Sequence, residues 1–480
     1  MTEPTEGQMP ELASAIPTKQ FFVSMLTRDI RLEDAILDLV DNCLDGALRS
    51  ADGTEVDYSK HFVEISFSTE NFSIKDDCGG IPRDIAKNYA FKMGRDSGDE
   101  RDSESETIGM YGIGMKRAIF KMGREALVTT RHGDDTYEVE ISSQWLDAKG
   151  WEPLPITEPR LDASPLNVPG TRIYVSSLYP GVARTFDNES FQNDLCTAIS
   201  EHFTSFLQRG LKILVNGQLT HPVRVEVLVS PREDGPAPFV FQQAIDDVLV
   251  SITVGLNTGR GLIGDEDDAT EFESDRSSAT AGWTVFCNDR AVIVGDKSRL
   301  SGWGDGIPLY HPQFAIITGV IEFKSKRAEK LPVTTTKRAL DTSSNVWLQS
   351  YPKMKEGMRV WISYTNKWKN RPLSDQSVYW KDARPLALGS VVDTIATRPN
   401  ARRTDGRIEF NPQKHPGSSF PEPEGLNPSS RRIIFSRPIE EISLVSKALF
   451  DSSDEKPGIV GEKCFELICQ NVQQQQQEEE

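Results

Sequence analysis

The stretch 37-LDLVDNCLDGA-47 combines an apolar helical repeat with four polar side chains. At 100° per residue, Asp38, Asn42 and Asp45 fall on one face of a helix, and Asp41 lies close by. The leucine and valine side chains form a stripe on another side, so the helix can pack while it presents carboxylate, amide and carboxylate. An ordinary amphipathic helix with a solvated face has the same pattern, so other segments must decide between the two interpretations.

Three segments downstream follow at informative spacing. Segment 74-IKDDCGGIP-82 is a strand that ends in two aspartates and small residues. A carboxylate at that place can accept a hydrogen bond from a ligand amine while the glycine backbone stays close to the ligand. In 108-IGMYGIGMKRAIFKMG-123, three glycines lead into a helix, and the backbone N–H groups there suit a phosphate. Segment 170-GT-171 presents a hydroxyl beside glycine at the start of a strand.

Each of these segments is weak evidence alone. A glycine-rich turn is usually only a turn, and a DDxGG run is usually a surface turn or a cation loop. Their order is more informative, because the polar helix precedes the aspartate strand, the glycine-led helix and the GT strand. Between the aspartate strand and the glycines lies 94-GRDSGDERDSESETIG-109, which is nearly devoid of apolar residues, so we expect a mobile loop there.

The composition is that of a globular chain of two to four domains, with 480 residues of which 37% are hydrophobic. A net charge of −18 disfavours a protein that coats nucleic acid with its whole surface, but a local basic patch is compatible with it. The six cysteines form no CxxC pair, which argues for reduced thiols and against a disulfide scaffold or a zinc site. No run of eighteen apolar residues and no secretory signal occurs, so we expect a cytoplasmic protein without a membrane span.

In this order the motifs resemble the ATP-binding domain of the gyrase B, heat-shock chaperone, histidine kinase and MutL (GHKL) superfamily, which has the Bergerat fold. The resemblance covers about residues 20–185, and its shape is similar to that of MORC-type stand-alone bacterial ATPases. It implies an α/β sandwich that binds ATP and Mg²⁺. The chain contains no Walker A motif, so a P-loop is not the alternative.

The resemblance implies a role for each matching residue. Asn42 would supply the amide oxygen that binds Mg²⁺, and the metal would bridge the phosphates. Asp76 would accept a hydrogen bond from the adenine amino group, and Thr171 would support Asp76 together with a water molecule. Gly80 would be the last glycine of the adenine-side motif.

The resemblance also assigns residues to the phosphate side of the nucleotide. Residues 94–113 would form a lid that closes over the nucleotide. Lys116, in the first turn of the helix after the lid, would add a positive charge near the phosphates. The glycines at the end of the lid that would wrap the phosphates are Gly109, Gly112 and Gly114.

Two positions depart from the family pattern. Hydrolysing members have glutamate four residues before the metal-binding asparagine, as general base for the attacking water, whereas this chain has Asp38. Its carboxylate is set back by roughly 1.5 Å, one C–C bond length, although a base must lie within about 2.6–3.2 Å of the group whose proton it takes. Either the helix lies closer, or the water shifts, or hydrolysis is slow. Cys78 replaces the first glycine of the adenine-side motif and narrows the space beside the adenine.

A lysine further along the chain is another candidate. In gyrase B and MutL, a transducer domain follows the ATP-binding domain and sends a lysine to the γ-phosphate, and 331-LPVTTTKRALD-341 resembles the loop that carries it. Lys337 is the first candidate and Arg338 the second, because a lysine suits phosphate as a point charge on a flexible stem. A helix start capped by Thr335 or Thr336 explains the threonines equally well.

The expected fold class is α+β, in four parts. A flexible arm (1–19) precedes a Bergerat-fold ATP-binding domain (20–185), a transducer-like α/β domain (186–340) and a mostly helical, partly irregular C-terminal region (341–480). Residues 324–371 are rich in lysine, arginine and aromatic residues, a composition that suits nucleic acid. The spacing of three and four between their aromatic and methionine residues instead favours a helix that packs in a core.

Two functions follow from the resemblance. The first is a Mg²⁺-dependent ATPase that slowly converts ATP and water to ADP and phosphate. Its lid closure would pair two chains into a homodimeric clamp on DNA or a partner protein, in bacterial DNA maintenance or phage defence. The second is a nucleotide sensor with little turnover, which Asp38 favours. A chaperone-like ATPase is a weaker alternative, because the chain lacks the long charged linker of heat-shock members.

Overall fold

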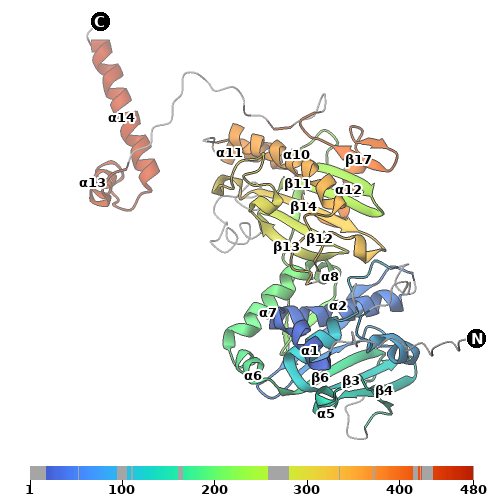
Figure 1. The fold of residues 1–480 in the computed structure, drawn as a ribbon. Coiled ribbons are helices and arrows are strands. Elements are labelled where there is room, and N and C mark those ends of the chain that lie inside the picture. Colours follow the sequence, from blue (N-terminus) through green and yellow to red (C-terminus); the bar gives the residue numbers. More distant parts are fainter. Residues whose placement is uncertain are drawn as a thin grey trace, which may run out of the picture. The chain divides into compact units, whose positions relative to one another are not determined.

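The computed structural model describes residues 18–51, 53–94, 105–109, 112–160, 166–257, 280–334, 336–369, 371, 373–414, 420–421, 423 and 436–478. They form two compact units, which lie within Met1–Glu422 and Pro423–Glu480 (Figure 1). The first unit contains two large sheets in succession along the chain, and the second unit contains a pair of helices.

The first domain is built on an eight-stranded sheet. Its strands are Phe62–Phe67 (β1), Phe72–Asp76 (β2), Gly123–His132 (β3), Asp135–Ile141 (β4), Ile156–Thr157 (β5), Gly170–Leu178 (β6), Lys212–Val215 (β7) and Gln218–Leu219 (β8). Their order across the sheet is β5-β4-β3-β6-β2-β1-β7-β8, and β1 and β7 run parallel. Val63 and Ile65 of β1 are buried while Glu64 and Ser66 are exposed, so the core covers one face of this strand.

Helices complete a two-layer sandwich with this sheet (Figure 1). They are Lys19–Arg28 (α1), Leu32–Ser50 (α2), Arg83–Ile85 (α3), Gly114–Met122 (α4), Ser143–Asp147 (α5), Pro180–Phe186 (α6), Glu189–His202 (α7) and Thr204–Gln208 (α8). The apolar stripe of α2, formed by Leu37, Val40 and Leu44, is fully buried in the core that the helices share with the sheet. Glu33 and Asp34 in the first turn of α2 suit the positive end of the helix dipole. The expected α/β sandwich is confirmed.

The boundary expected between residues 185 and 186 falls inside this domain. Strand β7 comes after that point in the chain, yet its Lys212 pairs with Phe62 of β1. Phe191 and Leu195 of α7 are buried in the same core as α2. The first domain therefore extends to about residue 220, because its sheet and its core both need the later segment.

The second domain is built on a seven-stranded sheet with the order β13-β12-β14-β11-β10-β17-β16, beside a two-stranded sheet, β15-β9. These strands are Glu226–Val229 (β9), Phe239–Ile245 (β10), Val248–Leu256 (β11), Gly282–Cys287 (β12), Arg290–Asp296 (β13), Ile317–Lys324 (β14), Arg384–Ala387 (β15), Arg402–Thr404 (β16) and Arg407–Phe410 (β17). Residues 282–296 form a hairpin of β12 and β13. Its turn residues Asn288 and Asp289 have φ of +46° and +65°, the positive values of a type I′ turn.

Helices cover both faces of the second sheet. They are Asn345–Lys367 (α10), Leu373–Trp380 (α11) and Leu388–Ala396 (α12). Neighbouring residues of a strand point to opposite faces. Phe239 and Phe241 of β10 join the core formed with α10, whereas Val240 between them joins the core formed with α12 and β9. The boundary expected at residue 340 therefore falls inside this domain, because α10 to α12 and the strands β15 to β17 complete it.

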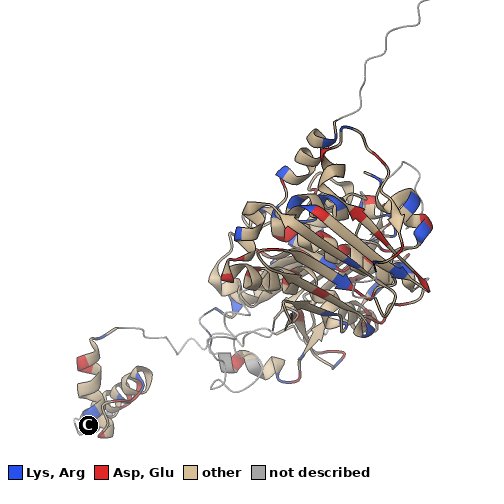
Figure 2. Ribbon diagram, turned by 90° about the horizontal axis from the view of Figure 1, so that it is seen from below, with Lys and Arg blue, Asp and Glu red and all other residues tan. Residues whose placement is uncertain are grey.

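The basic and aromatic segment 324–371 supplies core residues. Its buried aromatic side chains are Trp347, Trp361, Tyr364 and Trp368. The Trp361 Nε1 donates to the Val254 carbonyl oxygen across 2.5 Å, so this ring faces the sheet and not solvent. The interpretation as a packed helix is confirmed. Basic and acidic residues are interspersed over the described helices and strands of the first unit (Figure 2).

The second unit is a helical hairpin of α13 (Ile439–Phe450) and α14 (Pro457–Glu478). The Ser446 hydroxyl donates to the Ser452 carbonyl oxygen at 2.6 Å and closes the turn that follows α13. None of the helices in the described ranges is both long and apolar enough to cross a membrane.

Candidate functional site

The polar face of α2 is mostly buried, although three of its residues are carboxylates. Asp38, Asp41 and Asp45 are at most 2% exposed, whereas Asn42 among them is exposed. Buried carboxylates need charge or hydrogen-bond partners, since removing a bare charge from water is costly. Each carboxylate has such partners on a different segment, so α2 is the element to which the other parts of the site attach.

Asp45 holds the segment just before the glycine-rich turn. Its two carboxylate oxygens accept the backbone N–H groups of Ile108 and Gly109 at 2.7 and 2.8 Å. A Cβ on Gly109 would lie 2.7 Å from the Asp45 Oδ2, so a side chain at that position would disrupt the contact. No role for Asp45 follows from the sequence beyond its place on the polar face.

Asp38 lies where the glycine-rich turn becomes α4. A Cβ on Gly114, the first residue of α4, would lie 3.6 Å from the Asp38 Cβ, so the turn packs directly against this carboxylate. Arg117, one turn further along α4, donates from Nη2 to the Asp38 Oδ2. The Lys337 Nζ lies 3.5 Å from the Asp38 Oδ1. Both oxygens of Asp38 therefore have a cationic neighbour.

The second domain supplies Lys337. Its Nζ also donates to the Asp41 Oδ2 at 2.7 Å, and its side chain is 10% exposed. Burial alone would lower the pKa of Lys337, but the carboxylates of Asp41 and Asp38 outweigh burial and hold that pKa above its ordinary value. Lys337 adopts a left-handed backbone with φ of +55°. The structure thus brings Lys337 and Asp38 together from segments about 300 residues apart.

Arg338 points to a different part of α2. Its Nη2 lies 2.5 Å from the Asp34 Oδ1, and its Nη1 is 2.5 Å from the His202 Nε2. Burial, together with Arg290 and Arg338, lowers the pKa of His202 to about 3, so the ring is neutral. Its Nδ1–H then donates to the Ala291 carbonyl oxygen, which leaves Nε2 to accept from Arg338. Of the two basic candidates, Lys337 is the one beside Asp38.

Arg290 links α2 to the Lys337 backbone. Its Nε donates to the Asp41 Oδ1 at 2.7 Å, and its Nη1 donates to the Lys337 carbonyl oxygen at 2.9 Å. Asp41 is fully buried; burial alone would raise its pKa, but Arg290 and Lys337 hold it below the ordinary value. Arg290 begins β13 directly after the Asn288–Asp289 turn, so the hairpin between β12 and β13 inserts against α2. The sequence signal for this hairpin is the two-residue turn Asn288–Asp289 inside the segment 283–294.

The segment that follows β2, which the resemblance assigns to the adenine side, is a turn held by backbone hydrogen bonds. The Asp76 Oδ1 accepts the backbone N–H groups of Cys78 at 2.9 Å and Thr171 at 3.3 Å. Burial raises the pKa of Asp76 to about 6, against these hydrogen bonds, which lower it. Gly80 has φ of +71°, and a Cβ there would lie 2.0 Å from the Arg131 carbonyl oxygen, so only glycine fits. Asp76, Thr171 and Gly80 are brought together.

Residues 30–168 match the protein family described as histidine kinase-, DNA gyrase B-, and HSP90-like ATPase. The N-terminal domain belongs to the GHKL ATPase superfamily. It is therefore an ATP-binding domain of an ATPase family. The match does not single out the MORC-type members, and no curated protein matches the chain in sequence.

The segment 94–113, expected to form a lid, lies largely outside the described residues. Its described end includes Gly109, held by Asp45, and Gly112, whose φ is +64°. Lys116 is buried, and its Nζ donates to the Ala90 and Gly112 carbonyl oxygens, so it links the end of the lid to the segment before it. Thr335, one of the two candidate caps, also lies outside the described residues.

Among the described residues of the GHKL domain, Asn42 offers an oxygen ligand that suits a magnesium ion. The Asn42 amide is exposed on α2 one helical turn after Asp38, while its neighbours in the chain are buried. A neutral amide oxygen beside carboxylates is a ligand that Mg²⁺ accepts, and nucleotide phosphates would complete its coordination. The residues present therefore fit the ion that the superfamily implies.

Proposed function

We propose that the chain is a Mg²⁺-dependent ATPase in which the second domain senses the nucleotide through Lys337. The observation that carries this proposal is the position of the Lys337 Nζ, which lies 3.5 Å from Asp38 and 2.7 Å from Asp41 on the helix of the GHKL domain. A buried lysine that pairs with two carboxylates is a cation that a phosphate can attract, because the phosphate oxygens are charged acceptors and the lysine stem is flexible.

Each residue of the site would have its own role in binding or hydrolysing ATP. Asp76 would accept the adenine amino group, and Asn42 would hold Mg²⁺, which when bound neutralises phosphate charge. The backbone N–H groups from Gly109 to Gly114 and the N-terminus of α4 would bind the phosphate oxygens. Lys337 would leave its carboxylates for the γ-phosphate, and Asp38 would then have one oxygen free to take a proton from water.

The test is ATP turnover by the purified full-length chain, alongside Asn42→Ala and Lys337→Met. We expect Mg²⁺-dependent phosphate release by the wild type, loss of ATP binding in Asn42→Ala, and turnover lowered at least about tenfold in Lys337→Met with ATP still bound. Lys330→Met is the matched control, because Lys330 is 29% exposed and pairs with Asp247 away from α2. Equal turnover by the wild type and Asn42→Ala would refute the metal assignment.

A nucleotide sensor with little turnover is the second candidate. Two observations favour it: Asp38 is shorter than the usual glutamate, and both of its oxygens are engaged by Arg117 and Lys337. Tight ATP binding without phosphate release, with no turnover restored by Asp38→Glu, is the result that this candidate requires.

We further propose that ATP binding pairs two chains into a clamp on DNA or a protein client, in bacterial DNA maintenance or phage defence. The support is the resemblance of the motifs to GHKL members and the contact of the second domain with the site. Sedimentation of the chain with and without a nonhydrolysable ATP analogue tests the pairing. A single monomeric species in both conditions would contradict it.

A further inference from the structure

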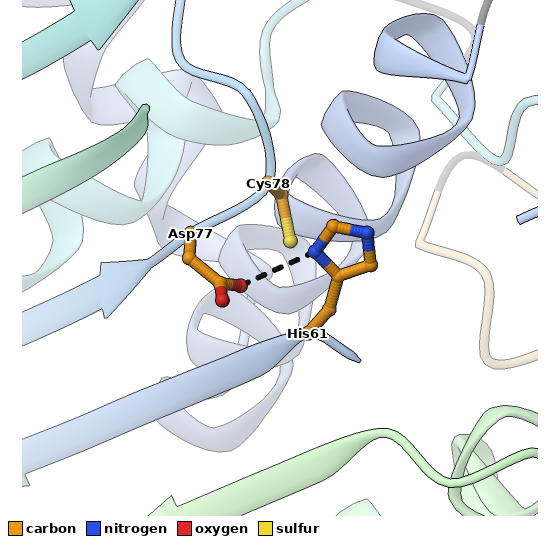
Figure 3. Close-up of side chains that lie close together, drawn as sticks. All are labelled: His61, Asp77 and Cys78. Carbon is orange, nitrogen blue, oxygen red and sulfur yellow. Dashed lines mark hydrogen bonds and ion pairs between the residues drawn. The ribbon is translucent and has the colours of Figure 1, made fainter. Parts of the chain in front are cut away.

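Three side chains that commonly bind metal ions lie together where β2 ends and β1 begins. They are His61, Asp77 and Cys78, drawn in Figure 3, and their donor atoms all lie within 4.8 Å of one another. The backbone enforces this proximity. Val63 pairs with Asp76 in the antiparallel ladder of β1 and β2, so the same register continued by two residues places His61 opposite Cys78.

The side chains point into the same space. The His61 Nδ1 lies 3.3 Å from the Asp77 Oδ1, and that oxygen also accepts the Phe62 backbone N–H at 2.9 Å, which fixes the carboxylate. Figure 3 shows the Cys78 sulfur and the His61 ring nitrogen directed toward one another. Around a tetrahedral zinc ion with bonds of about 2.0–2.3 Å, ligand atoms lie about 3.3–3.8 Å apart. The His61–Asp77 distance already lies in that range, and no pair of donor atoms exceeds it by more than about 1 Å, since all lie within 4.8 Å.

The donor types indicate which ion would bind. One nitrogen, one oxygen and one sulfur suit Zn²⁺, whereas Mg²⁺ and Ca²⁺ prefer oxygen ligands throughout. Cys78 is 1% exposed, but the side chains of His61 and Asp77 are 23% and 15% exposed, so an ion can enter from their side. Three protein ligands leave a fourth position for water.

We propose that His61, Asp77 and Cys78 bind one Zn²⁺ ion. Its ligands do not include Asn42, the ligand proposed for Mg²⁺, and it does not depend on the proposed ATPase activity. The ion would tie the turn that follows β2 to the residue before β1, directly beside Asp76. The absence of a CxxC pair argues against a zinc site whose ligands are neighbours in the sequence. It does not argue against ligands that the pairing of β1 and β2 brings together.

The first test is a cobalt titration of the full-length chain, reduced and freed of metal by a chelator, without nucleotide. Co²⁺ occupies zinc sites and shows a thiolate-to-metal absorption band when a cysteine binds it. We expect one equivalent of Co²⁺ per chain, a band that Zn²⁺ abolishes, and loss of the band in Cys78→Ser. Cys287→Ser and Cys469→Ser are matched controls, one buried and one exposed cysteine, and both should keep the band.

The second test does not depend on the folding of a variant at the buried Cys78. His61→Ala and Asp77→Asn change partly exposed side chains and should each weaken Co²⁺ binding at least about tenfold. Zn²⁺ should raise the thermal midpoint of the wild type and not of His61→Ala. The proposal is overturned if the wild type binds less than a tenth of an equivalent, or if the band survives in both Cys78→Ser and His61→Ala, since the metal then binds at other cysteines.

Discussion

Asp38 lies between two cations, Arg117 and Lys337. In this arrangement the carboxylate has no oxygen free of a positive neighbour, and a general base needs one. An incoming γ-phosphate would compete with Asp38 and Asp41 for Lys337, because a doubly charged anion attracts the ammonium more strongly than either carboxylate does alone. In the proposed mechanism, the shorter side chain of aspartate and the competition for Lys337 would both affect the same step, the transfer of a proton from water.

Asp38→Asn should separate proton transfer from nucleotide binding. The amide keeps the size of the carboxylate but cannot act as a base, so we expect turnover to fall about 100-fold or more while ATP affinity changes by less than about threefold. Phosphate release and equilibrium binding of ATP measure the two quantities. Asp57→Asn, an exposed capping position outside α2, is the control and should match the wild type. Turnover unchanged in Asp38→Asn would exclude this residue as the base.

The proposed role of Asp76 at the adenine predicts that nucleotide binding depends on pH. Burial raises the pKa of Asp76 to about 6, so its carboxyl is ionised at pH 7.5 and mostly protonated at pH 5. A protonated oxygen no longer accepts a hydrogen bond from an adenine amino group, and we expect affinity for ATP to fall up to about tenfold between these values. Titration calorimetry of the wild type and Asp76→Asn measures it. The phosphates of ATP ionise in the same way in both experiments, so only the wild type should show the additional pH dependence. The same pH dependence of affinity in both proteins would contradict the prediction.

The hairpin of β12 and β13 connects the second domain to two parts of the GHKL domain. Arg290, just after its turn, pairs with Asp41 on α2. Asn288, in the turn, donates from Nδ2 to the Thr107 carbonyl oxygen at 2.9 Å, just before the glycines at the end of the lid. It also donates to Ser325 in its own domain at 2.9 Å. One hairpin of the second domain therefore contacts both α2 and the segment just before Gly109.

A double-mutant cycle on Arg290→Gln and Asp41→Asn should show strong coupling. Both side chains are at most 2% exposed, and removing one partner leaves a buried charge unpaired. We expect a coupling free energy of about 1.5–3 kcal/mol from denaturant unfolding. The control is the Arg124–Asp147 pair, with side chains 43% and 63% exposed, for which solvent screening keeps the coupling below about 0.5 kcal/mol. Similar values for the two pairs would contradict the role given to Arg290.

Local patterns predicted the elements of the site better than the contacts between them. The stripe of α2 and the turn at Asp76 follow from periodicity and glycine placement, which act over a few residues. The pairing of Asp41 with Arg290 joins residues 249 positions apart, and no local pattern specifies such a contact. Arg117 has a partial signal, since it lies three residues after Gly114 and shares a helix face with it. The pairing of β10 with β17 depends equally on tertiary packing.

The architecture of the first unit determines which fragments of the chain can fold alone. A fragment of residues 1–220 retains β7, β8, α7 and α8. A fragment of residues 1–185 lacks β7, so the edge of β1 is unpaired. It also lacks Phe191, so the core residues that pack against Phe191 are exposed. An exposed edge strand with an open apolar core favours aggregation. We expect the longer fragment to be recovered in soluble form with a cooperative thermal transition, and the shorter one to aggregate. Soluble yield and circular dichroism on heating check this, and equal behaviour would contradict the domain limit near residue 220.

The parallel pairing of β7 with β1 also orders events during synthesis. Phe62 leaves the ribosome about 150 residues before its partner Lys212, so β1 must wait with an open edge while the nascent chain grows. At about 5–20 residues per second, that interval is roughly 8–30 seconds. Contacts of such high sequence separation form slowly. We therefore expect the newly made GHKL sheet to be open to chaperone binding until β7 emerges, and slow codons placed before residue 212 to prolong that exposure.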